Sequence, residues 1–137
     1  MRLGKRGHSL LALKALFRAV VLERDGHRCR KCGSGKRPGR GGGLQAAHIY
    51  PQGSHPSMRF RLENAITLCA SCHIYGRNAW HRHPKAALDW ARRELGDDLL
   101  YKLDLITRVR GNRLDKELTR IYLEGELRAY EGLARCS

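Results

Sequence analysis

Two pairs of cysteines, each with C-x-x-C spacing, constrain the fold of this chain more than any other feature of its sequence. Cys29 and Cys32 form the first pair, and Cys69 and Cys72 form the second. Two thiolates at this spacing can bind one tetrahedral zinc ion from a single turn of backbone. The interval between the pairs is longer than in most zinc fingers, so four reduced cysteines without metal remain an alternative. We expect one four-cysteine zinc site, with Cys136 as a bystander.

The second cysteine pair also belongs to a C-x-x-C-H string, Cys69 to His73, which in other proteins attaches a c-type haem. Haem of this type is attached in compartments that proteins reach through a signal peptide. The apolar N-terminal segment SLLALKALFRAVVLE is interrupted by Lys14 and Arg18, so it predicts an amphipathic helix without a signal sequence or a membrane span. We therefore favour zinc over a cytochrome, and we expect no membrane association.

Positive charge is concentrated in the first half of the chain. The formal net charge is +14, and residues 1–61 contain 14 Lys and Arg but only two Asp and Glu. This imbalance indicates a polyanionic partner such as DNA, although a merely solvated basic surface is the alternative. The glycine-rich segment from Gly33 to Gly43 contains Lys36, Arg37 and Arg40 and predicts a loop. That loop either follows DNA phosphates or only connects its neighbours.

The apolar periodicity of the chain predicts an α+β fold. The short apolar runs at residues 44–49 and 65–68 predict strands, and a helix is expected from the second cysteine pair to about Trp80. Further helices are predicted at residues 9–24, 84–95, from residue 97 and from residue 115. We expect a single domain with an N-terminal helix (1–26), a zinc-bound core (27–84) and a helical C-terminal extension (85–137).

His48, Asn64 and His73 lie between or beside the cysteine pairs, within the strings AAHI and RFRLENAITLCASCH. Here the chain resembles the HNH endonucleases, whose ββα-metal motif reads His, Asn, His and is often flanked by two C-x-x-C zinc pairs. The resemblance extends from Cys29 to about Pro84. The string GSHPSMRF and the helical tail are more particularly similar to phage HNH proteins, including NinG-type recombination nucleases.

The resemblance implies that the chain hydrolyses DNA phosphodiester bonds with one catalytic divalent cation, Mg²⁺ or Mn²⁺. His48 would be the general base and His73 a ligand of the cation. Asn64 would either tie down the loop that aims His48 or bind the cation itself. Many relatives carry a second metal-binding His or Asp immediately before the base, where this chain has Ala47. His81 is our candidate substitute, because it follows His73 by eight residues and would share its helix face.

Several basic residues flank the motif and are candidates for contacts with DNA phosphates: Arg59, Arg61, Arg77, Arg82 and Lys85. Ala47 favours an alternative in which the chain is a zinc-stabilised DNA-binding module without catalysis. For a nuclease, the sequence leaves open nicking, double-strand cleavage and cleavage of branched DNA. It also leaves the oligomeric state open, a homodimer included. The expected location is the cytoplasm of a bacterium or of a phage-infected host cell.

Overall fold

The structure, a computed structural model, describes residues 9–35, 43–109 and 113–136. At its centre is a two-stranded antiparallel sheet made of β1 (Gln45–His48) and β2 (Ala65–Leu68). The register pairs Gln45 with Leu68 and His48 with Ala65. Both strands lie where the apolar runs of the sequence predicted them, so the α+β class is confirmed at the level of a small sheet among helices.

Four α-helices surround the sheet at the predicted places: α1 (Leu10–Arg24), α2 (Pro84–Leu95), α3 (Asp97–Arg108) and α4 (Lys116–Cys136). Short turns of 3₁₀ helix form η1 (Pro56–Met58) and η2 (Leu62–Asn64). Local signals set the helix starts: the Ser9 hydroxyl accepts a hydrogen bond from the Ala12 amide at 3.1 Å. Within the described ranges, no helix is long and apolar enough to cross a membrane.

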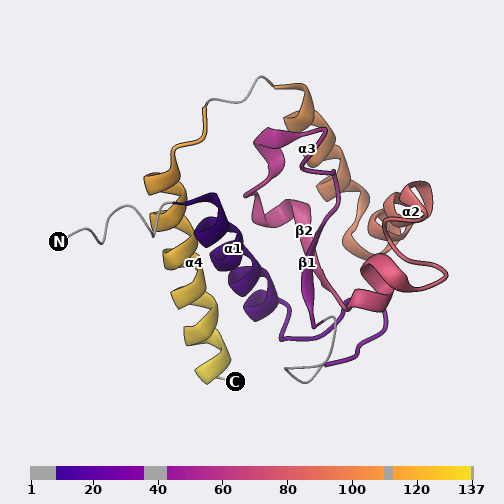
Figure 1. Cartoon of the computed structure of the whole chain (residues 1–137), viewed down its shortest axis with the longest axis horizontal. Helices are drawn as coiled ribbons and strands as arrows, with labels where there is room; N and C mark the ends of the chain where they lie inside the picture. Colours follow the sequence, from indigo (N-terminus) through magenta and orange to yellow (C-terminus); the bar gives the residue numbers. More distant parts are fainter. Residues whose placement is uncertain (1–8, 36–42, 110–112, 137) are drawn as a thin grey trace.

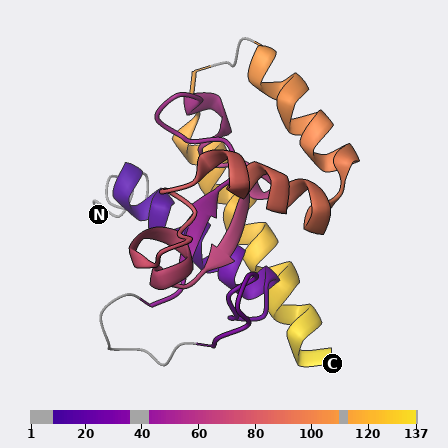
Figure 2. The same cartoon turned by 90° about the vertical axis from the view of Figure 1, so that its right-hand side faces the viewer.

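Alternating side chains of the two strands fill two separate cores. Ala47 and Ile66 pack with residues of α2 and α3 such as Ala91. Ala65, on the other face, packs with Phe17 of α1 and with residues of α4. Accordingly, α1 and α4 run side by side along one side of the hairpin, and α2 and α3 lie on the other (Figures 1 and 2). Because successive side chains of a strand point to opposite faces, alternate strand residues pack toward α1 and α4 or toward α2 and α3.

Arg24 and Asp25, which form an ion pair with each other, also connect the end of α1 to the sheet through hydrogen bonds. The Asp25 carboxylate accepts hydrogen bonds from Arg24 at 2.9 Å and from the Thr67 amide at 2.8 Å. Arg24 also donates to the carbonyl oxygens of Leu62 and Ala65, each at 2.6 Å. Burial alone would raise the pKa of Asp25, but the hydrogen bonds and charge of Arg24 and the Thr67 amide lower it overall. Residues at the end of α1 therefore also position β2.

The predicted helix from the second cysteine pair to Trp80 is wrong in length. Only a five-residue π-helical turn, η3 (Ser71–Tyr75), forms, and Gly76 then continues in an extended conformation. A Cβ atom at Gly76 would lie 2.6 Å from the Ser71 carbonyl oxygen, so this close turn requires glycine. The chain then folds back, and the Trp80 amide donates to the Cys72 carbonyl at 2.7 Å. The helix expected for a ββα core is therefore only a single turn here.

Candidate zinc site and active site

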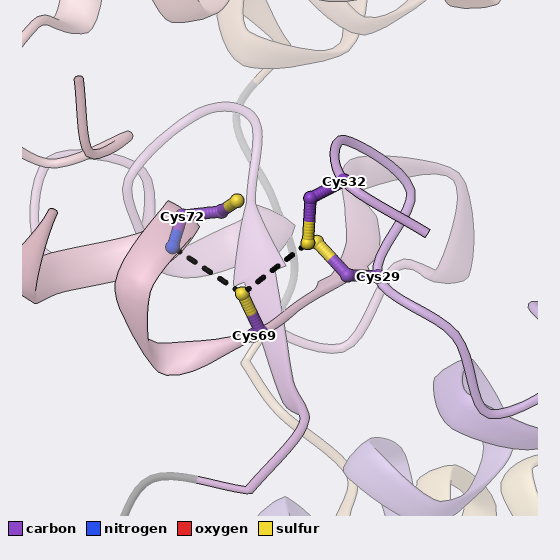
Figure 3. A group of neighbouring side chains, drawn as sticks. All are labelled: Cys29, Cys32, Cys69 and Cys72. Carbon is purple, nitrogen blue, oxygen red and sulfur yellow. Dashed lines mark hydrogen bonds between the residues drawn. The ribbon is translucent and has the colours of Figure 1, made fainter. Parts of the chain in front are cut away.

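The four cysteines of the two C-x-x-C pairs meet at one point of the structure (Figure 3). Their sulfur atoms all lie within 4.8 Å of one another, and the Cys32 and Cys69 sulfurs are 3.7 Å apart. A tetrahedral zinc ion with Zn–S bonds of about 2.3 Å holds its sulfurs about 3.8 Å apart. The cluster could therefore hold a zinc ion, and it favours this use of the C-x-x-C-H string over haem attachment.

Backbone hydrogen bonds bring the first cysteine pair to the second. The Cys29 amide donates to the Ser34 carbonyl at 3.0 Å, which closes a tight loop around the pair. The next amide, that of Arg30, donates to the Thr67 carbonyl of β2 at 2.9 Å. Because the second pair begins immediately after β2 ends at Leu68, this bond places both pairs at the same end of the hairpin.

Two thiols of the cluster, those of Cys32 and Cys72, have pKa values shifted in opposite directions. Hydrogen bonding with Ser34 lowers the pKa of Cys32 to about 6. Burial raises the pKa of Cys72, and the neighbouring thiols raise it further. Four thiolates this close to one another repel unless a cation lies among them, which is the situation that a bound zinc relieves. Cys136 is exposed near the end of α4 and is not part of the cluster.

His48 is held by three contacts at the end of β1. Its Nε2 lies 2.8 Å from the Arg59 carbonyl oxygen, and its ring stacks on Phe17 with 5.5 Å between centroids and 7° between planes. Trp80 donates from its indole nitrogen to the His48 carbonyl at 3.0 Å. Because a carbonyl only accepts, Nε2 carries the proton and Nδ1 keeps its lone pair. Burial lowers the pKa of His48, which favours the neutral ring.

His73 and His81 face each other across the same site. Their Nε2 atoms are 2.8 Å apart, although the two residues do not share a helix. The other ring nitrogen of His73, Nδ1, lies 2.5 Å from the Gln45 side-chain oxygen, so Nδ1 carries the proton and Nε2 presents its lone pair toward His81. Burial, with smaller contributions from His81 and His48, lowers the pKa of His73 to about 4. Two imidazole nitrogens this close suit ligation of one cation.

A cavity of about 340 Å³ joins these groups, and His48, His73, His81 and Gln52 all line it. A smaller hollow of about 210 Å³ also contains His48, His73 and Gln52, together with Lys14. The side-chain oxygen of Gln52 is buried and has no hydrogen-bond partner among the described residues. An unpartnered carbonyl oxygen in the same cavity as these imidazoles is a further group that a divalent cation or an ordered water would satisfy.

Asn64 is fully buried at the end of η2. Its side-chain oxygen accepts from the Tyr50 amide at 2.9 Å, and its nitrogen donates to the Tyr50 carbonyl at 3.0 Å. The nitrogen also lies 3.4 Å from the Met58 carbonyl. Asn64 lines neither hollow at His48. This placement supports the loop-tying role suggested for Asn64 rather than cation binding.

The candidate DNA contacts are distributed around the site. Arg59 lines the hollow that contains His48, and Arg59 and Arg61 both line a second groove. Arg77, Arg82 and Lys85 are exposed. Lys36, Arg37 and Arg40 lie outside the described residues.

Three residues of the site were not predicted from the sequence: Gln45, Gln52 and Lys14. Glutamine and lysine are common surface residues, and neither cysteine spacing nor apolar periodicity distinguishes these three. Gln45 lies three residues before His48 on the same strand, yet its partner His73 is 28 residues away. These residues can be assigned to the site only from the tertiary structure, which brings their segments to the hollows at His48 and His73.

Residues 29–80 of the chain match a family model described as HNH endonuclease. The matched segment includes both cysteine pairs, His48, Asn64 and His73, and it ends one residue before His81. It covers less than half of the chain, so the likeness concerns the cysteine cluster, the hairpin and η3. No curated protein and no solved structure matches the chain.

Proposed function

We propose that this protein is a metal-dependent endonuclease that hydrolyses phosphodiester bonds of DNA. The observation that carries the proposal is one cavity lined by His48, His73 and His81. His48 uses its Nε2 to bond Arg59, which leaves Nδ1 able to accept a proton, and the Nε2 atoms of His73 and His81 face each other. The match of residues 29–80 to the HNH endonucleases supports it. The high positive charge of the chain suits a polyanionic substrate.

His48 would act as the general base. Its Nδ1 would take a proton from a water molecule, whose oxygen then attacks phosphorus while the bond to the leaving ester oxygen breaks. A base must be unprotonated at the start, and burial keeps the pKa of His48 below that of a free histidine. The bonds from its Nε2 to Arg59 and from Trp80 to its backbone would keep the ring from turning away from the water.

His73 and His81 would hold the catalytic divalent cation, Mg²⁺ or Mn²⁺, with the orphaned oxygen of Gln52 as an additional oxygen ligand. The cation would stabilise negative charge on the phosphoryl and leaving oxygens. Gln45 would orient His73 by accepting from its Nδ1, as carboxylates and carbonyls do for many metal-binding histidines. His81 and Gln52 would take the place of the metal-binding His or Asp that many relatives carry where this chain has Ala47. Asn64 would then only tie down the loop that contains Gln52.

The zinc ion would have no part in the chemistry. Four thiolates close its coordination shell, so no position is open for water or substrate. Its role would be to join the loop after α1 to the end of β2.

The substrate would approach along the basic side of the cavity. Lys14 and Arg59 line the hollow at His48, and both are placed to attract a phosphate. The segment with Lys36, Arg37 and Arg40 is proposed, from the sequence alone, to follow the DNA backbone. Cleavage of branched DNA, as in NinG-type nucleases, and a homodimeric state also rest on the sequence alone.

A DNA-binding module without catalysis is a second candidate, and Ala47 favours it. This residue is fully buried in the core, so no side chain reaches the cation from the position before His48. Such a module would keep the zinc cluster and the basic surface but would not cleave DNA. Incubation of supercoiled plasmid with Mg²⁺ or Mn²⁺ distinguishes the two functions, because only a nuclease converts it to nicked or linear DNA.

The decisive variant is His48→Ala. Loss of a general base should lower plasmid cleavage by about two to four orders of magnitude, while DNA affinity stays unchanged. His27→Asn is the matched control, since His27 is exposed near the end of α1 and asparagine tolerates its φ of 54°. Cleavage by well-folded His48→Ala at the wild-type rate would refute the role of His48.

His73→Ala tests the cation site separately. Because a ligand rather than a base is lost, residual cleavage should require a higher concentration of Mg²⁺ or Mn²⁺ than the wild type requires. A metal titration of the cleavage rate measures this shift. An unchanged midpoint of the titration would exclude His73 as a ligand.

A further inference from the structure

We propose that a groove beside the cleavage site binds unpaired nucleotides, so that the substrate is DNA with a single-stranded segment next to the cleaved bond. The groove has a volume of about 830 Å³ and lies between residues 56–61 and the start of α4. We call it the arginine groove, because Arg59, Arg61 and Arg113 line it together with Phe60 and Tyr122. The inference deepens the proposed function and rests on it for the cleavage step alone.

The charges of the groove favour an anion. None of its three arginines forms an ion pair with an acidic residue in the described parts of the chain. The Nε of Arg59 is buried and has no hydrogen-bond partner there. The neighbouring carboxylate of Glu63 is already paired with Lys102 at 3.4 Å. Guanidinium groups without carboxylate partners are what a chain of phosphates would satisfy.

The apolar part of the groove favours unpaired bases over a duplex. Tyr122 is 49% exposed and Leu118 is 63% exposed, and both line the groove with Phe60. In a duplex the bases are stacked inside and present only phosphates and groove edges to such a surface. A base of single-stranded DNA exposes its face and can stack on an aromatic ring. Arginines beside exposed aromatic residues are therefore typical of single-stranded sites.

The arginine groove is continuous with the proposed catalytic site. Arg59 and Phe60 line both the groove and the hollow that contains His48. The backbone oxygen of Arg59 also accepts the hydrogen bond from His48 Nε2. A strand that lies in the groove and passes Arg59 would thus bring one of its phosphates toward His48. Binding in the groove would select DNA in which the bond to be cut adjoins unpaired nucleotides.

Fluorescence anisotropy with labelled oligothymidylate of about 12 nucleotides, within the usual size of single-stranded sites, tests the inference. EDTA is not used, to protect the zinc cluster, and divalent cations are omitted so that no cleavage occurs. We expect the wild type to bind this probe more tightly than a duplex of equal length. Tyr122→Ala should weaken binding of the single strand about tenfold, the usual effect of losing one stacked base.

Arg113→Ala should also weaken binding and should lower the salt dependence of single-strand affinity by about 0.7 in logarithmic slope, the value for one lost phosphate contact. Two exposed residues outside the groove provide matched controls: Arg128→Ala on α4 removes the same charge, and Tyr101→Ala on α3 removes the same ring. Both controls should keep wild-type affinity for the single strand.

Equal affinity for single strand and duplex, or unchanged affinity in Tyr122→Ala, would overturn the inference. So would a dimer in sedimentation experiments that Tyr122→Ala dissociates without loss of DNA affinity, because the groove would then be a protein interface. The proposed nuclease fails independently, if the wild type cuts no plasmid or His48→Ala cuts it normally. Binding in the groove and cleavage at His48 are thus judged by separate measurements.

Discussion

Replacing Asn64 with alanine should destabilise the protein and disturb the site without touching any proposed ligand. The Asn64 side chain is fully buried and bonds both backbone groups of Tyr50, at 2.9 Å and 3.0 Å. Tyr50 lies two residues after His48, at the start of the segment that contains Gln52. The amide of Asn64 therefore holds the connection between β1 and η1 in place.

The magnitude follows from the groups that the substitution leaves unpaired. The N–H and C=O of Tyr50 each lose their partner, and a buried polar group without a partner costs about 1–3 kcal/mol. Since water can enter part of the space left by the amide, we expect a loss of about 3 kcal/mol in the free energy of unfolding. For a chain of this length, that corresponds to a melting temperature lower by about 10 °C.

Thermal unfolding followed by circular dichroism measures the loss, with Asn78→Ala as the control because Asn78 is exposed. Below the melting transition, plasmid cleavage should fall about ten- to a hundredfold, since small misplacements of reacting groups are costly. Zinc content should stay at the wild-type level, because the cysteine cluster does not contact Asn64. A melting temperature within about 2 °C of the wild type would refute the reasoning, since it would mean that the two bonds to Tyr50 contribute almost nothing.

Purified protein should contain about one zinc ion per chain, and Cys69→Ser should lose it and unfold at lower temperature; metal analysis that finds no zinc in the wild type would contradict this. A general base works only when unprotonated, and burial lowers the pKa of His48. The kcat/KM for cleavage should therefore decline on acidification only below about pH 6.5, where a free histidine titrates. A decline centred above that pH would disagree with a buried His48. Neutralising Lys36, Arg37 and Arg40 together should weaken duplex binding and reduce its salt slope by about 2.7 if each contacts a phosphate, whereas an unchanged slope would identify their segment as a connector.

Local patterns in the sequence were sufficient to predict most elements. The strand formed by Ala65–Leu68 and the helix formed by Pro84–Leu95 match the predicted segments, because apolar periodicity and flanking proline or glycine act within a few residues. The joining of the two cysteine pairs was also predictable, since four thiols at C-x-x-C spacing have few other uses. His48, Asn64 and His73 were singled out as site residues through the family resemblance.

Tertiary structure alone decided how the site is completed. The predicted helix after Cys72 would have carried His81 on the same face as His73, but a turn at Gly76 brings the two rings together instead. Gln45 and Gln52 join the site from β1 and from the segment after it. Nothing local distinguishes these glutamines from surface residues. Spacing and periodicity describe neighbours along the chain, whereas a site depends on which side chains meet when distant segments cross, and packing and buried hydrogen bonds determine that crossing.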